Sequence, residues 1–108
     1  MEYQNLFIDV LLEQFDKFEW NRDNFEFSTE VGNFNVILDQ AQTGTVLRVN
    51  CLNEEGEWDQ NSVYADDNDK VLLAYNKVFD LWNARQKERF WKEAAENLAS
   101  IALTSNKI

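Results

Sequence analysis

Carboxylates are the only abundant side chains in this sequence that could carry out chemistry. The chain has 108 residues, with 20 aspartates and glutamates, 10 lysines and arginines, one cysteine and no histidine. Without histidine, no Ser-His or Cys-His pair can form and no imidazole can transfer a proton near neutral pH. One cysteine alone does not hold a structural zinc ion, and three glycines are too few for a phosphate-binding loop. The sequence therefore lacks the usual catalytic groups.

Paired carboxylates could still serve glycoside hydrolysis or magnesium chemistry. Both need a cleft, and a two-layer domain of this length offers little room for one. The acidic tract of residues 54–69 also lacks the spacing, central glycine and terminal glutamate of an EF-hand calcium loop. We therefore expect a protein that binds rather than catalyses, with no cofactor and no metal.

The acidic charge is concentrated in the first two thirds of the chain. Residues 1–69 hold 16 acidic and three basic side chains, whereas residues 70–108 hold four acidic and seven basic ones. Such a field repels nucleic acids and anionic membranes, and it attracts basic protein surfaces. The alternative is that the charge serves only solubility.

Three groups of residues are predicted to contact a partner. One lies on the first predicted helix (Asp9, Glu13, Asp16), one on the open face of the predicted sheet (Glu26, Glu30, Asp39), and one in a loop (Glu54, Glu55, Glu57, Trp58, Asp59). The loop surrounds an aromatic side chain with carboxylates, as is common at protein interfaces. Its alternative is a solvated turn before a favourable helix N-terminus. Both Trp20 and Trp58 are predicted to lie either in the core or at an interface.

Apolar residues at helical spacing predict an amphipathic helix over residues 3–18. Its core-facing side is predicted to comprise Leu6, Phe7, Val10, Leu11, Phe15 and Phe18. Its acidic residues form a separate stripe with few basic neighbours.

Alternating apolar and polar residues then predict an antiparallel β-meander with a two-residue turn at Gly32-Asn33. In the predicted register Phe34 pairs with Cys51, which places Cys51 on the core face of the sheet. We therefore expect the Cys51 thiol to react slowly with thiol reagents in the native protein. The same register sets Glu26 opposite Asp39, with Arg48 diagonal to Asp39. Residues 58–65 are expected to add a short fourth strand.

A long C-terminal helix is predicted over residues 69–103, capped by the polar residues 66–69. At 1.5 Å per residue it would be roughly 50 Å long, whereas a compact chain of this length is only about 35 Å across. The helix must therefore either break near residues 83–88, where its apolar stripe has a polar gap, or project into a partner subunit. Arg85, Arg89 and Lys92 share one side of it and are expected to pair locally or to contact the acidic half of the chain.

Together these elements predict one α+β domain spanning residues 1–108. It is a two-layer sandwich with an N-terminal helix, an antiparallel three- to four-stranded β-meander, and a long or broken C-terminal helix. No apolar run reaches the ~18–20 residues of a membrane span, and a single cysteine suits a reducing compartment. We expect a cytoplasmic protein.

The charge distribution favours a stoichiometric inhibitor, an acidic nucleic-acid mimic that neutralises a basic, nucleic-acid-handling protein such as a nuclease. Phage counter-defence proteins of the anti-CRISPR kind and the immunity proteins of nuclease toxins act in this way. One alternative is a small acidic chaperone or adaptor that holds a client segment along its sheet. For either function, a homodimer through the C-terminal helix is an alternative to a monomer. A second alternative function is that of a structural phage subunit. No direct contact with nucleic acid or membrane is expected.

Overall fold

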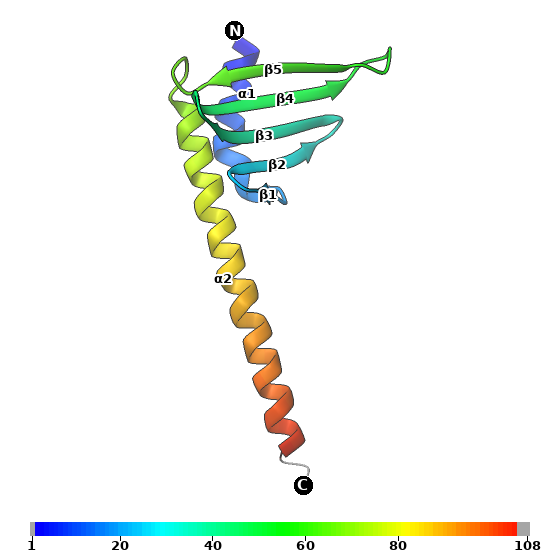
Figure 1. Cartoon of the computed structure of the whole chain (residues 1–108), viewed down its shortest axis with the longest axis vertical. Coiled ribbons are helices and arrows are strands. Elements are labelled where there is room, and N and C mark those ends of the chain that lie inside the picture. Colours follow the sequence, from blue (N-terminus) through cyan, green and yellow to red (C-terminus); the bar gives the residue numbers. More distant parts are fainter. Residues whose placement is uncertain (1, 106–108) are drawn as a thin grey trace.

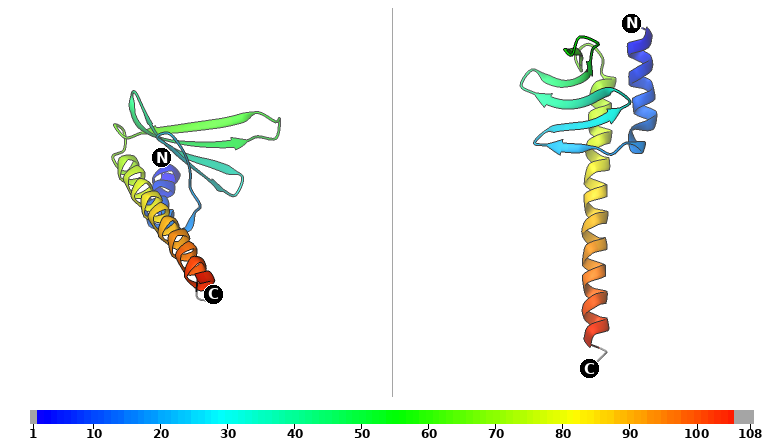
Figure 2. Two further views of the ribbon diagram at one scale, coloured as in Figure 1. Left: turned by 60° about the horizontal axis from the view of Figure 1, so that its bottom comes forward. Right: turned by 90° about the vertical axis from the view of Figure 1, so that its right-hand side faces the viewer.

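The protein consists of one antiparallel sheet and two helices (Figure 1). The computed structural model describes residues 2–105. The chain forms helix α1 (Glu2–Gln14), a 3-10 turn (Phe15–Lys17), five strands and helix α2 (Lys70–Ser105). The strands are β1 (Asn21–Asp23), β2 (Glu26–Val31), β3 (Phe34–Ala41), β4 (Gly44–Leu52) and β5 (Trp58–Tyr64). They pair in sequence order, and both helices lie on one side of the sheet (Figure 2). The predicted two-layer α+β fold is confirmed.

The strand register is the predicted one. Val31 pairs with Phe34, and Phe34 pairs with Cys51. Gly32 has a φ of 60°, which suits the first position of a type II′ turn and which residues with a Cβ rarely adopt. Strand β1 has no counterpart in the prediction, because its three residues are too few to show a periodicity.

The core lies between the sheet, α1 and the first half of α2. Its buried residues are Ile8, Leu11, Trp20, Phe27, Val36, Leu38, Leu47, Val71, Ala74, Tyr75 and Val78. The ring of Phe27 meets those of Tyr75 and Trp82 edge-on, with centroids 5.5 and 6.3 Å apart. Trp20, which was predicted to lie either in the core or at an interface, lies in this core. Its indole N–H donates to the carbonyl of Phe15 at 2.8 Å.

Helix α1 buries only part of the predicted face. Leu11 is 4% exposed as predicted, and Phe7, Phe15 and Phe18 pack against the core. Ile8, which was not predicted to face the core, is 1% exposed, whereas Leu6 and Val10 are 55% and 45% exposed. The α-helix also ends at Gln14, earlier than predicted. Ile8 lies nearly half a turn around the helix axis from Leu6 and Val10 at 100° per residue, and both of these sides of α1 are apolar. Periodicity alone does not say which side meets the sheet, and here the side of Ile8 does so.

One end of the sheet extends past both helices (Figure 1). This end carries the β2–β3 turn and the β4–β5 loop. As a result Phe34 is 46% exposed and Cys51 is only half-buried. Cys51 lies on the core face as predicted, but it is only partly buried because no helix covers this end of the sheet.

Helix α2 runs unbroken from Lys70 to Ser105, so the alternative of a break near residues 83–88 is wrong. Asn68 caps it, since its Oδ1 accepts a hydrogen bond from the Lys70 N–H at 3.1 Å. The molecule measures 67 × 33 × 26 Å. It is elongated because the second half of α2 extends beyond the rest of the protein (Figure 1). We call residues 2–85 the body. No helix within residues 2–105 is long and apolar enough to cross a membrane.

Candidate functional site

The open face of the sheet, which points away from the helices, contains a cluster of three charged side chains. Glu26 and Asp39 pair directly across β2 and β3. The Arg48 guanidinium lies 2.6 Å from the Asp39 carboxylate and 3.4 Å from that of Glu26. The predicted contact between Arg48 and Asp39 is thus confirmed, and it relieves the repulsion between the two carboxylates. These two predicted partner-binding residues consequently present less free charge than their types imply.

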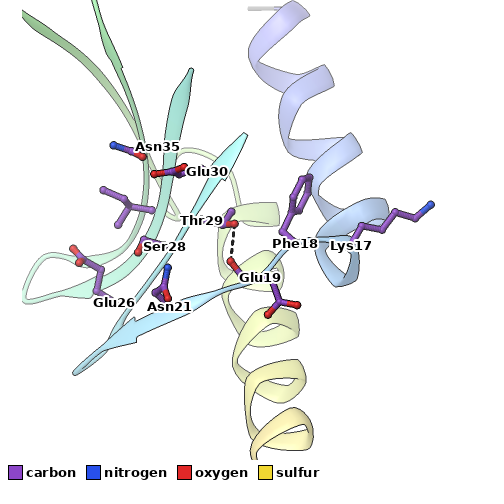
Figure 3. Close-up of a pocket in the computed structure, with 10 residues that line it drawn as sticks. Lys17, Phe18, Glu19, Asn21, Glu26, Ser28, Thr29, Glu30 and Asn35 are labelled. Carbon is purple, nitrogen blue, oxygen red and sulfur yellow. Dashed lines mark hydrogen bonds between the residues drawn. The ribbon is translucent and has the colours of Figure 1, made fainter. Parts of the chain in front are cut away.

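A polar hollow of about 650 Å³ lies beside this cluster (Figure 3). Its lining comprises Lys17, Phe18, Glu19, Asn21, Glu26, Ser28, Thr29, Glu30, Asn35 and Ile37. The Thr29 hydroxyl donates to the carbonyl of Glu19 at 2.8 Å and so ties one wall of the hollow to β2. Asn35 pairs across the sheet with Asn50, whose side-chain oxygen is buried without a hydrogen-bond partner among the described residues. Sequence reasoning missed this hollow, since it depends on how the segment before β1 passes the sheet.

The β4–β5 hairpin projects furthest from the helices (Figure 1). At its end Leu52 pairs with Trp58, and the two side chains are 52% and 62% exposed. They share the open face with Arg48, because alternate residues of a strand share a face. Four exposed carboxylates adjoin them, on Glu54, Glu55, Glu57 and Asp59. We call these six residues the hairpin tip.

Asn53 fixes the conformation of the hairpin tip. Its Oδ1 accepts hydrogen bonds from the backbone N–H groups of Glu55 and Glu57 at 3.0 and 2.9 Å. Its own N–H donates to the carbonyl of Glu57 at 2.7 Å, and Gly56 supplies a φ of 81°. Sequence reasoning missed Asn53, although an asparagine shortly before a glycine is a turn signal. These hydrogen bonds define the backbone turn that carries the carboxylates.

The acidic residues of the first predicted group lie in the helical layer, away from the open face of the sheet. Asp9 forms an ion pair with Lys70 at 2.7 Å, and this hydrogen bond raises the pKa of Lys70. Glu13 and Asp16 are exposed on α1 and on the turn that follows it. The structure therefore separates this group from the other two, whereas Glu30 and the hairpin tip share the sheet.

Of the three basic residues predicted on one side of α2, Arg85 contacts the acidic half of the chain. The Arg85 guanidinium donates to the backbone carbonyls of Phe18 and Asp16 at 2.7 and 2.6 Å. These carbonyls follow the C-terminal end of α1, where a cation is favourable. Arg85 thus attaches α2 to the acidic half of the chain, and Arg89 and Lys92 line a shallow hollow beside it.

A second hollow, of about 320 Å³, is almost entirely apolar. It is lined by Tyr3, Leu6, Phe7, Val10, Leu11, Phe18 and Val31. It exists because α1 exposes its second apolar side, and sequence reasoning missed it by assigning those residues to the core.

Two further observations concern chemistry. Within residues 2–105, no three histidine, cysteine, aspartate or glutamate side chains are grouped so that they could hold a metal ion. Burial raises the pKa of Tyr75, whose hydroxyl donates to the carbonyl of Phe25 at 3.0 Å, and this tyrosine belongs to the core.

Comparison with known protein families, characterised proteins and solved structures gives no significant match. Function must therefore be argued from the surfaces of this chain alone.

Proposed function

We propose that this protein is a non-enzymatic binding module that captures a basic surface of a nucleic-acid-handling protein. The observation that carries the proposal is the hairpin tip, where the exposed Leu52–Trp58 pair adjoins four carboxylates on a loop that Asn53 holds in place. A tip that is already ordered loses little conformational freedom when it binds.

The two components of the tip have separate roles in this proposal. The carboxylates take positions that phosphates would occupy on the partner, and their charge speeds association. Trp58 acts as the anchor, because exposed tryptophans flanked by polar groups are typical of interface hot spots. The proposal places the protein in the cytoplasm, where nucleic-acid-handling partners and a reduced cysteine are both expected.

A second candidate function is an adaptor that holds an extended client segment on the open face of the sheet. The polar hollow favours it, since carboxylates and amides there provide hydrogen-bond acceptors along β2 and β3.

The test uses a fluorescent arginine-rich peptide of about twelve residues as a probe of basic surfaces. We expect binding to weaken at least tenfold when Glu54, Glu55 and Glu57 are all replaced by lysine. Binding should also weaken steeply with salt, because exposed charges are screened within about 10 Å at 0.1 M.

The matched control replaces Glu88, Glu93 and Glu96 on α2 by lysine, which changes the net charge by the same amount. If both triple variants lose the same affinity, the peptide responds only to net charge and the proposal is wrong. Trp58→Ala in the otherwise unchanged protein should weaken binding without altering the salt dependence. A weakening confined to Glu26→Gln and Glu30→Gln variants, which lie in the polar hollow, would favour the adaptor instead.

A further inference from the structure

The second half of α2 exposes an apolar stripe that its own body does not cover. Phe90, Trp91, Leu98 and Ile101 are 63–69% exposed. Together with Ala94, which shares their side of the helix, we call them the distal stripe. Exposed apolar patches of this kind mark interaction surfaces. In proteins, most of the stability of a helix comes from packing of its apolar face rather than from helix propensity.

The distal stripe faces away from the body of its own chain, so that body cannot cover it. In the first half of α2, Val71, Ala74 and Val78 face the core. At 100° per residue, Trp91 and Leu98 lie about half a turn around the helix axis from Val71. The stripe therefore points away from the side on which the body lies, where Arg85 donates hydrogen bonds to the segment after α1.

We infer that a second copy of this chain covers the distal stripe, and that the two α2 helices pair antiparallel. A two-fold axis near residue 96 sets Ala94 opposite Leu98 of the second copy and Trp91 opposite Ile101. The small Ala94 then faces the larger Leu98, which lets the two helices approach closely at this point. A parallel pair would instead set Trp91 against Trp91 and Lys87 against Lys87, which is unfavourable for both size and charge.

Charge supports the same orientation. Residues 1–69 carry 16 acidic and three basic side chains, so two bodies repel each other. In the antiparallel pair the two Arg85 residues are about 33 Å apart along the axis, which is well beyond the screening length of about 8 Å at physiological salt. A parallel pair would place the two bodies side by side.

The available area is sufficient for an interface of modest size. The four large side chains of the distal stripe expose on the order of 500 Å² per copy. Two copies would bury on the order of 1,000 Å² in total, which is about the lower limit for a specific interface. We therefore expect a dimer that dissociates at low micromolar concentration or below, rather than a permanent one.

The first test is the molar mass of the full-length protein by sedimentation equilibrium between 1 and 200 μM. We expect a monomer–dimer equilibrium, and the double variant Trp91→Ala, Leu98→Ala should weaken it at least thirtyfold. The control is Leu72→Ala, Leu73→Ala, which removes two exposed leucines of the same helix outside the stripe and should leave the equilibrium unchanged. A monomer at 200 μM, or a dimer that survives the stripe variant, overturns the inference.

The second test measures orientation with spin labels on cysteines placed in a Cys51→Ser background. A label at Gln86 should lie about 30 Å from its counterpart along the axis, whereas a label at Asn97 should lie about 10–15 Å away. Equal short distances at both positions would mean a parallel pair and would contradict the inferred arrangement. Neither test involves the hairpin tip, so the outcome does not depend on the proposed function.

Discussion

At the scale of single residues, Arg48 determines how many carboxylates the open face of the sheet tolerates. Its guanidinium contacts both Asp39 and Glu26, which would otherwise repel each other across β2 and β3. These carboxylates therefore stabilise the sheet together with Arg48, whereas those of the hairpin tip have no such partner among the described salt bridges. Reversing charges at the hairpin tip should consequently disturb the fold less than reversing those of Glu26 or Asp39.

We predict that Arg48→Met lowers the free energy of unfolding by about 1–2 kcal/mol, because it leaves two half-buried carboxylates facing each other. Adding Asp39→Asn should recover a part of this loss. The measurement is urea unfolding followed by circular dichroism at pH 7. A double variant that is less stable than Arg48→Met alone would mean that Arg48 acts through packing and not through charge.

At the scale of elements, the two helices cover only part of the sheet. Leu38 and Phe34 both lie on the core face of β3, but Leu38 is fully buried whereas Phe34 is half-exposed at the uncovered end. Position along the strand thus matters as much as the face that a residue occupies.

We therefore predict that Leu38→Ala lowers the free energy of unfolding by about 2–5 kcal/mol, as expected for a fully buried leucine. Phe34→Ala should cost only about 1 kcal/mol although phenylalanine is larger, because half of its surface is already in water. Urea unfolding of both variants gives the comparison. Equal losses would show that the end of the sheet is covered in solution, for example by another molecule.

The strand register could be predicted from the sequence because alternation and a glycine turn constrain each other. Pairing Val31 with Phe34 fixes every later pair in the meander. The burial of Leu11 could be predicted, but that of Ile8 in place of Leu6 could not, because these two residues lie on sides of α1 that are both apolar. The uncovered end of the sheet could not be predicted either, since no periodicity reports how far strands extend past helices.

The same limits apply to the candidate site. The carboxylates and Trp58 of the hairpin tip could be selected from composition and spacing. The role of Asn53 depends on hydrogen bonds to Glu55 and Glu57, and the polar hollow depends on the path of the chain before β1. The turn at Asn53 is local, and the asparagine before Gly56 is a signal for it in the sequence. The hollow is a tertiary feature that single-sequence patterns do not encode.

At the scale of the whole molecule, two different surfaces lie far apart. The hairpin tip projects from one end of the sheet, and the distal stripe lies on the part of α2 that leaves the body (Figure 1). The elongated shape, with a radius of gyration of 18.9 Å, keeps them separate. An antiparallel pair of helices would therefore present two hairpin tips at opposite ends of one assembly, which could bind two basic surfaces at once and gain avidity.

The most direct test of the central claim, that the hairpin tip is the binding surface, is a residue-resolved NMR titration with the arginine-rich peptide. We predict that the largest backbone amide shift changes fall within residues 52–59, with smaller changes on the open face around Glu30. Changes spread equally over Glu13 and Asp16 in the helical layer and Glu93 on α2 would contradict the claim, because they would mean that the peptide follows charge alone.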